Sequence, residues 1–68
     1  MNDDEMLTAE EVAQIMKTSI KTVRGWVQSG ELARVPIGKR EYRIVRRDLN
    51  AFIAKRRQQN IVLPEKDN

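Results

Sequence analysis

The sequence predicts a small, mainly α-helical domain with one β-hairpin, in the order helix, helix, hairpin, helix. Three observations favour this fold class. Apolar residues recur at helical spacing in three short segments, they alternate with polar residues on both sides of Gly38, and 68 residues leave room for one domain only. We expect the domain to span residues 7–58, between a flexible acidic leader at 1–6 and a C-terminal tail at 59–68.

The first two helices are predicted from their caps and their apolar faces. The first begins at a capping box formed by Thr8 and Glu11 and should end near Lys17. The second begins at Ser19 and ends at Gly30, a residue suited to the left-handed conformation past a helix C-terminus. The apolar positions are Val12, Ile15 and Met16 in the first helix and Ile20, Val23, Trp26 and Val27 in the second. Two short helices joined by a short polar turn form a helix-turn-helix.

A hairpin and a third helix complete the predicted fold. Apolar and polar residues alternate over 32–37 and 40–45, on either side of a glycine-containing turn, as in a half-buried hairpin. Pro36 cannot donate to a strand ladder, so it suits an edge strand or the open side of the hairpin. The third helix should begin near Asp48, and its apolar pattern dissolves from Gln58 onward. This order of elements is that of a small winged helix-turn-helix.

Charge is distributed unevenly along the chain. Residues 1–16 carry five acids and no base, whereas residues 17–57 carry twelve bases and three acids, a local net charge of +9. Such an excess on a compact domain is typical of proteins that bind nucleic acid. A merely solvated basic surface is the alternative that charge alone leaves open.

Composition argues against several other function classes. The chain has no cysteine and no histidine, which excludes a disulfide scaffold and the usual zinc sites and removes the common catalytic base and thiol nucleophile. A domain this small is expected to have no room for a pocket of about 300 Å³, so we expect no enzyme activity, no cofactor and no small-molecule ligand. No apolar run is long enough for a membrane span and the acidic start is unlike a signal peptide, so a soluble, cytoplasmic protein is expected.

The exposed face of the second helix and the tip of the hairpin are the predicted DNA-binding surfaces. On a recognition helix, Arg and Gln can form bidentate hydrogen bonds with guanine and adenine, and a threonine methyl group can contact thymine. The candidates on this helix are Lys21, Thr22, Arg24, Gly25 and Gln28. On the wing, contacts to phosphates are expected, and the candidates are Lys39, Arg40, Tyr42 and Arg43. Arg34, Arg46 and Arg47 are weaker candidates.

Two residues of the second helix admit two interpretations each. Gly25 stands inside a helix, where glycine is less favourable than alanine by up to about 1 kcal/mol. The functional interpretation is close approach of the helix backbone to DNA. The alternative has no binding role and is packing against a neighbouring element, or neutral drift. Trp26 can stack on single-stranded bases or fill the core, and its place on the apolar stripe favours the core.

Several stretches, taken in order, form a specific pattern over about residues 6–56. They are Leu7–Ala13, Thr22–Val27, Ser29–Leu32, Ile37–Arg40, Tyr42–Ile44 and Arg47–Phe52. This pattern resembles the excisionase-type DNA-binding domains of the MerR-like winged helix-turn-helix superfamily. The resemblance implies that Thr22, Arg24 and Gly25 lie in the helix that enters the major groove, and that Lys39 and Arg40 form the wing tip at the backbone or minor groove. The family often has a basic residue where Gly25 stands.

The resemblance also implies a function. Similar members act as recombination directionality factors: they bind repeated sites at the end of an integrated phage or mobile element, bend the DNA and help an integrase to assemble the excisive complex. The implied partners are therefore double-stranded DNA and an integrase, of the tyrosine type or another. Other small members regulate transcription, and this alternative stays open. A protein-interaction adaptor that uses residues 60–63 is less favoured, because it does not account for the basic segment.

The predicted assembly is a monomer in free solution. No heptad pattern follows the third helix, so we expect no coiled-coil dimer. The resemblance adds that MerR regulators carry further helices for dimerisation, whereas this chain stops at Asn68, so we expect no effector sensing either. Neighbouring protomers are expected to bind adjacent DNA sites cooperatively, because DNA holds them at high effective concentration. The apolar triplet Ile61-Val62-Leu63 is expected either to pack back on the third helix, which is favoured, or to contact a neighbouring protomer or an integrase.

Overall fold

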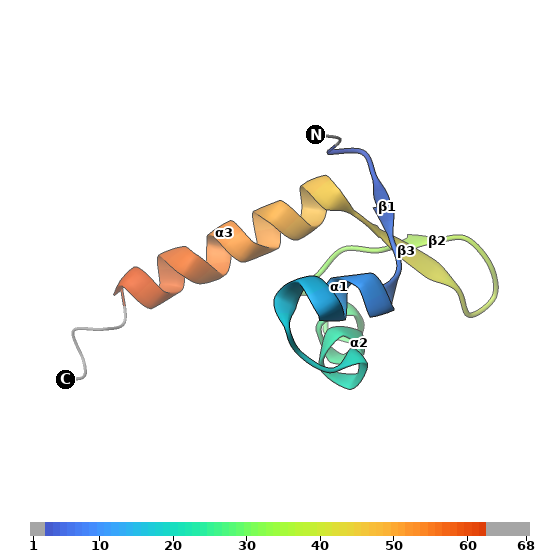
Figure 1. Cartoon of the computed structure of the whole chain (residues 1–68), viewed down its shortest axis with the longest axis horizontal. Coiled ribbons are helices and arrows are strands. Elements are labelled where there is room, and N and C mark those ends of the chain that lie inside the picture. The colour runs from blue at the N-terminus through green and yellow to red at the C-terminus, as the bar shows by residue number, and fades with distance from the viewer. Residues whose placement is uncertain (1–2, 63–68) are drawn as a thin grey trace.

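The computed structural model describes residues 3–62, and the side chains of residues 3–58. Within these residues it contains the helices α1 (Ala9–Met16), α2 (Ile20–Gln28) and α3 (Arg46–Val62) and the short strands β1 (Met6–Leu7), β2 (Val35–Pro36) and β3 (Tyr42–Val45). The strands form one antiparallel sheet in the order β1-β3-β2. This is the predicted winged helix-turn-helix, with the β2–β3 hairpin as the wing (Figure 1).

The two helices of the helix-turn-helix begin where their capping residues predict. The Thr8 hydroxyl accepts a hydrogen bond from the Glu11 amide at 3.0 Å, and the Thr8 amide donates to the Glu11 carboxylate at 2.8 Å, so the capping box is complete. The Ser19 hydroxyl accepts from the Thr22 amide at 3.1 Å at the start of α2. Both caps thus satisfy amide donors that a helix leaves free at its start.

Residues with positive φ follow the C-terminal ends of both helices. Lys17 ends α1 with a φ of 56°, and its amide donates to the carbonyls of Ala13 and Gln14. A left-handed backbone is uncommon for a lysine, and the sequence pattern did not predict it. Gly30 follows α2 with a φ of 86°, which confirms the predicted helix end.

The wing is shorter in its strands and longer in its loop than the alternating pattern predicts. Residues 37–41 form the loop, in which the amides of Ile37 and Gly38 donate to the Glu41 carbonyl at 2.9 and 3.3 Å. These two hydrogen bonds close the turn and leave only short strands on either side. Pro36 lies on β2, an edge strand of the sheet, as predicted.

The N-terminal segment lies against the start of α3. For residues 3–6 the prediction of a flexible leader is therefore wrong. The last of them belongs to β1, which pairs with β3. The side chains of Arg46 and Arg47 form ion pairs with Glu5, at 3.4 Å, and with Asp4. We call residues 3–6 the N-terminal strap.

The strap also explains why α3 begins at Arg46, two residues before the predicted Asp48. The Arg46 amide donates to the Glu5 carbonyl and the Arg47 amide donates to the Asp3 carbonyl, each at 2.8 Å. Backbone carbonyls from the far end of the chain thus satisfy two donors of the first turn of α3. No residue next to the helix indicates this.

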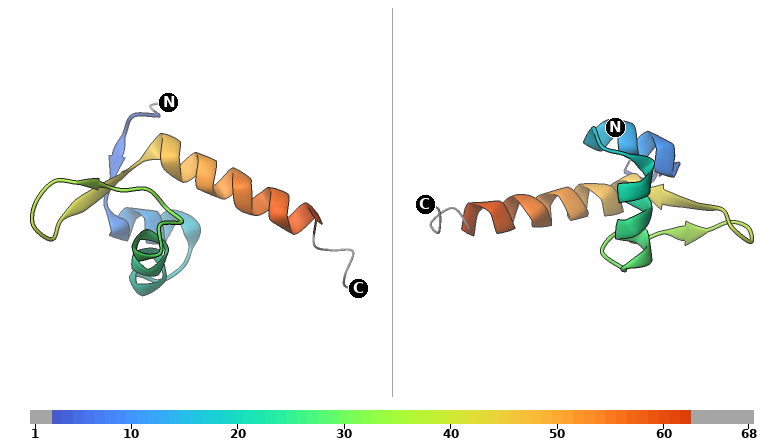
Figure 2. Two further views of the ribbon diagram at one scale, coloured as in Figure 1. Left: turned by 180° about the vertical axis from the view of Figure 1, so that it is seen from behind. Right: turned by 90° about the horizontal axis from the view of Figure 1, so that it is seen from below.

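α3 also continues past its predicted end. Its backbone stays helical through Val62, although the apolar pattern stops near Gln58. Lysine, arginine and glutamine are good helix formers, so the backbone does not need an apolar face to continue. Of the predicted apolar triplet, Ile61 and Val62 belong to this helix, whereas Leu63, with the rest of the tail, lies outside the described residues. α3 and the wing extend to opposite ends of the molecule (Figure 2).

A small apolar core joins the helix-turn-helix, the sheet and the first turns of α3. Its buried side chains are Leu7, Val12, Ala13, Val23, Val27, Leu32, Ile44, Leu49 and Phe52. Trp26 packs against this core with its ring centroid 4.8 Å from that of Phe52, which confirms the core interpretation of Trp26. Ile15, expected on the buried face of α1, is exposed instead.

Candidate nucleic-acid interface

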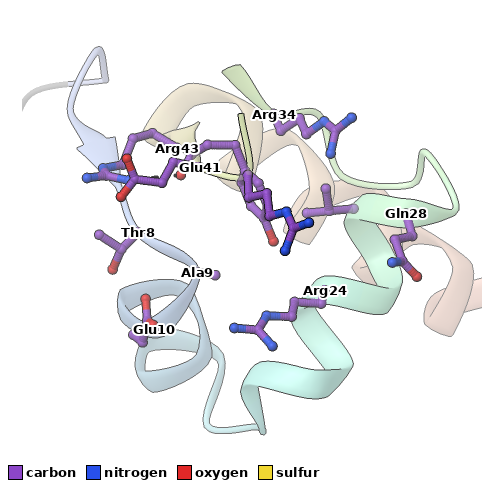
Figure 3. Close-up of a pocket in the computed structure, with 11 residues that line it drawn as sticks. Thr8, Ala9, Glu10, Arg24, Gln28, Arg34, Glu41 and Arg43 are labelled. Atoms are coloured by element: carbon purple, nitrogen blue, oxygen red, sulfur yellow. Dashed lines mark hydrogen bonds between the residues drawn. The ribbon is translucent and has the colours of Figure 1, made fainter. Parts of the chain in front are cut away.

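An open groove of about 440 Å³ lies between α2 and the wing, with the N-terminal turn of α1 beside it (Figure 3). The expectation that so small a domain has no pocket above about 300 Å³ is therefore wrong. The reason is that the groove lies on the surface between two elements and takes no volume from the core. Its lining residues are Thr8, Ala9, Glu10, Arg24, Val27, Gln28, Arg34, Arg40, Glu41, Tyr42 and Arg43.

Positive charge predominates in this groove. Among the described residues that line it, four are arginines and two, Glu10 and Glu41, are acidic, so the formal net charge of this lining is +2. Among the residues that the structure describes, no ion pair involves any of its four arginines. The arginines come from α2, the segment before β2, the wing loop and β3: Arg24, Arg34, Arg40 and Arg43. An anionic ligand would thus meet cations on both walls of the groove.

The five candidates on α2 are all exposed, and they divide into two groups. Arg24 and Gln28 line the groove and share it with the wing, and Figure 3 shows the Arg24 side chain extending from α2 toward the start of α1. Lys21, Thr22 and Gly25 do not line the groove. α2 therefore offers one edge to the groove and a second, outward face beside it.

Gly25 lies at the centre of this outward face. At 3.6 residues per turn it stands about 160° around the helix from each of the buried residues Val23 and Val27. Thr22 is placed at the helix start, where its hydroxyl oxygen lies 3.0 Å from that of Ser19. The Thr22 hydroxyl is thus engaged in the cap, and its methyl group remains for an apolar contact.

The four wing candidates lie at different depths. Lys39 is exposed in the wing loop and does not line the groove, whereas Arg40, Tyr42 and Arg43 do. Arg43 donates to the Tyr42 carbonyl at 3.0 Å. The Arg34 guanidinium stands 5.7 Å from the centroid of the Tyr42 ring, which packs against the core. These contacts hold Arg43 of β3, and Arg34 in the segment before β2, on the wall of the groove.

Sequence reasoning undervalued Arg34 and gave no role to Glu10 and Glu41, which also line the groove. Arg34 comes before β2, two residues from Pro36, and because Pro36 pairs with Tyr42 the register puts Arg34 on the face of Tyr42, over whose ring its guanidinium lies. The alternation of apolar and polar residues in this segment was the only local signal of that placement. The two glutamates gave no such signal, because capping and turn positions account for them.

Other cations of the basic segment are occupied within the chain. Arg46 and Arg47 are paired with the N-terminal strap. The Arg56 guanidinium lies 5.3 Å from the centroid of the Trp26 ring and forms an ion pair with the Glu31 carboxylate at 3.4 Å. Within the described part of the chain, ion pairs thus engage three of the twelve bases of residues 17–57, so the positive charge available to a ligand is smaller than the sequence count.

Comparison with known families gives the same fold over most of the chain. The model of a family described as Helix-turn-helix domain matches residues 6–57, from β1 into α3. The chain belongs to this helix-turn-helix family. No curated protein and no solved structure matches the chain in the same comparisons. Membership of a helix-turn-helix family implies DNA binding, and the basic groove of this helix-turn-helix domain has the charge that such a ligand needs.

Two further properties of the described residues bear on function. No helix between residues 3 and 62 is both long and apolar enough to cross a membrane. Among the residues that the structure describes, no group of three or more acidic, histidine or cysteine side chains is placed to hold a metal ion.

Proposed function

We propose that this helix-turn-helix domain binds double-stranded DNA in a sequence-specific manner, with α2 in the major groove and the wing against the adjacent backbone or minor groove. The observation that carries the proposal is the basic groove shared by α2 and the wing. B-form DNA has a major groove about 12 Å wide, which admits one α-helix. The arginines on the wing side of the groove can then approach phosphates beside that helix.

The proposed contacts follow from the position of each side chain. Arg24 and Gln28 have the fork and amide geometry that can recognise guanine and adenine edges. Lys21 and the Thr22 methyl group lie on the same exposed side of α2, within the half of a recognition helix that usually contacts bases. In the wing, Lys39 and Arg40 are proposed to contact phosphates, and Tyr42 and Arg43 to support them.

Selection from a random duplex library tests this proposal. The full chain should enrich one sequence, and its affinity for that duplex should exceed its affinity for an unrelated duplex by about 10³-fold or more at physiological salt. The selected sequence in single-stranded form should bind more weakly. Enrichment of no sequence, or stronger binding to the single strand, would contradict sequence-specific duplex recognition.

We infer further that DNA binding serves excision of an integrated phage or mobile element. The support is the resemblance of residues 6–56 to excisionase-type domains, which includes the helix, the wing and the start of the last helix. In this role several protomers bind adjacent sites, bend the DNA and recruit an integrase. The protein is proposed to be a monomer without DNA and to bind neighbouring sites cooperatively.

Footprinting on the DNA that flanks the gene distinguishes the roles. Protection of adjacent direct repeats beside an attachment site, with slow migration of bent duplexes, is expected for an excisionase. Adding the protein to the element's integrase should then raise the yield of excised circles. A single protected site at a promoter, with no effect on excision, would indicate transcriptional control instead. Capture of a protein partner without any duplex binding would indicate an adaptor.

A further inference from the structure

Gly25 occupies a position where the backbone of this chain does not require glycine. It is the sixth of nine residues of α2, far enough from the ends to lie within the hydrogen-bonded helix, and its carbonyl accepts from the Ser29 amide at 3.0 Å. Among the described glycines, only Gly30 has a positive φ. A glycine inside a helix lowers helix stability relative to alanine. Its presence at residue 25 therefore needs a reason other than backbone conformation.

Packing within the chain does not supply that reason. A Cβ atom built on Gly25 meets no heavy atom within 4 Å, in contrast to Gly38, where it would lie 3.6 Å from the Glu41 carboxylate. Of the interpretations that the sequence leaves open, close contact with a neighbouring element of the described chain is thus excluded. A side chain at residue 25 would point into solvent, and space within the domain would accept it.

The surroundings of Gly25 are those of a contact surface. Residues four before and three after a helical position are its neighbours on the helix surface, and here they are Lys21 and Gln28. Both are exposed, and Gln28 and the adjacent Arg24 also line the basic groove. A patch of bare backbone therefore lies between long polar side chains, on the side of α2 turned away from the core.

We propose that Gly25 is the point at which the α2 backbone contacts the base edges in the major groove, and that its missing side chain sets how deeply the helix enters. This inference rests on the proposed DNA-binding function. A methyl group at residue 25 would stand between the backbone and the bases and hold the helix farther out. Hydrogen bonds from Lys21 and Gln28 would then exceed the range of about 2.7–3.2 Å in which they are effective. Gly25 is thus a specificity-determining residue that acts by leaving space.

The Gly25→Ala variant separates this role from a structural one, because its effects on stability and on binding have opposite signs. Its melting temperature should rise by about 4–8 °C, as expected for removing a helix-interior glycine from a domain of this size. Its affinity for the duplex selected by the native chain should fall by about tenfold or more. Its affinity for an unrelated duplex should change by less than about threefold, because phosphate contacts dominate there.

Asn50→Ala is the matched control. Asn50 is exposed on α3, and alanine is the better helix former there too, so its melting temperature should rise while binding to both duplexes stays unchanged. A second variant, Gly25→Leu, tests the steric argument, since its affinity for the selected duplex should fall below that of Gly25→Ala.

Two results would overturn the inference. One is a Gly25→Ala variant that binds the selected duplex as tightly as the native chain. The other is a loss that does not grow from alanine to leucine. If the native chain itself prefers no duplex, the proposed function and this inference both fall. A native chain with clear preference and an unaffected variant would overturn the role of Gly25 alone.

Discussion

Removing one wing cation should reduce the salt dependence of DNA binding by a defined amount. Each phosphate that a cationic side chain neutralises adds about 0.9 to the slope of log affinity against log salt concentration. Six cations near the groove form no ion pair within the described part of the chain: Lys21, Arg24, Arg34, Lys39, Arg40 and Arg43. If about five of them meet phosphates, the native slope is about −4 to −5. The Arg40→Ala variant should show a slope of about −3.5.

Fluorescence anisotropy of a labelled duplex, titrated with protein at several sodium chloride concentrations between about 50 and 200 mM, measures this slope over the range in which the effect is large. Arg57→Ala is the matched control because Arg57 is exposed on α3, does not line the groove and carries the same charge. Its slope should equal that of the native chain. Both variants remove one unit of positive charge, so a difference between their slopes shows that the position of the charge matters and not the net charge alone.

Two results would refute the reasoning. A native affinity that hardly changes with salt would mean that phosphate contacts do not dominate binding. Equal reductions of the slope in Arg40→Ala and Arg57→Ala would mean that net charge matters and the groove does not.

Three further predictions test the site and the caps. Arg24→Ala should reduce the free energy of binding to the selected duplex by about 1–3 kcal/mol and relax the preference at one base pair, whereas Lys39→Ala should weaken binding to all duplexes about equally. Binding titrations on a set of mutated sites check this, and an equal loss of specificity in the two variants would contradict it. Lys17→Gly should be more stable in thermal unfolding than Lys17→Ala by about 1 kcal/mol, because only glycine accepts the positive φ without strain; equal stability would contradict this. Thr8→Ala should lower the stability by about 1 kcal/mol through loss of the α1 cap, and an unchanged melting temperature would show that the cap is dispensable.

Local patterns were sufficient to predict the elements that local interactions form. The capping box of α1 and the hydroxyl cap of α2 each use residues three positions apart, so Thr8 and Ser19 mark the starts of these helices in the sequence itself. Gly30 marks the end of α2 in the same way. The order of these elements then indicates a winged helix-turn-helix, because two short helices before a hairpin have few other ways to bury their apolar faces.

Contacts between distant segments were not visible in the sequence. The carbonyls of Asp3 and Glu5 accept hydrogen bonds from the first amides of α3, more than forty residues later, and no residue type is needed for a carbonyl to do so. The start of α3 at Arg46 follows from this pairing and from no local signal. The groove is a similar case, since its walls come from α2 and the wing, and only their packing brings Arg24 near Arg43.

The strap changes how the charge of the domain is understood. The sequence shows an acidic start and a basic middle as two separate segments, but folding brings Asp4 and Glu5 against Arg47 and Arg46. These acids neutralise cations at the start of α3, whereas the cations of α2 and the wing form no ion pair with any residue that the structure describes. A charged ligand responds to the summed field of a molecule, so the cations that stay free determine the direction from which an anion is attracted. The pairing therefore directs positive charge to the face that carries α2 and the wing. We conclude that the N-terminal strap contributes to the proposed DNA interface although none of its residues lines the groove.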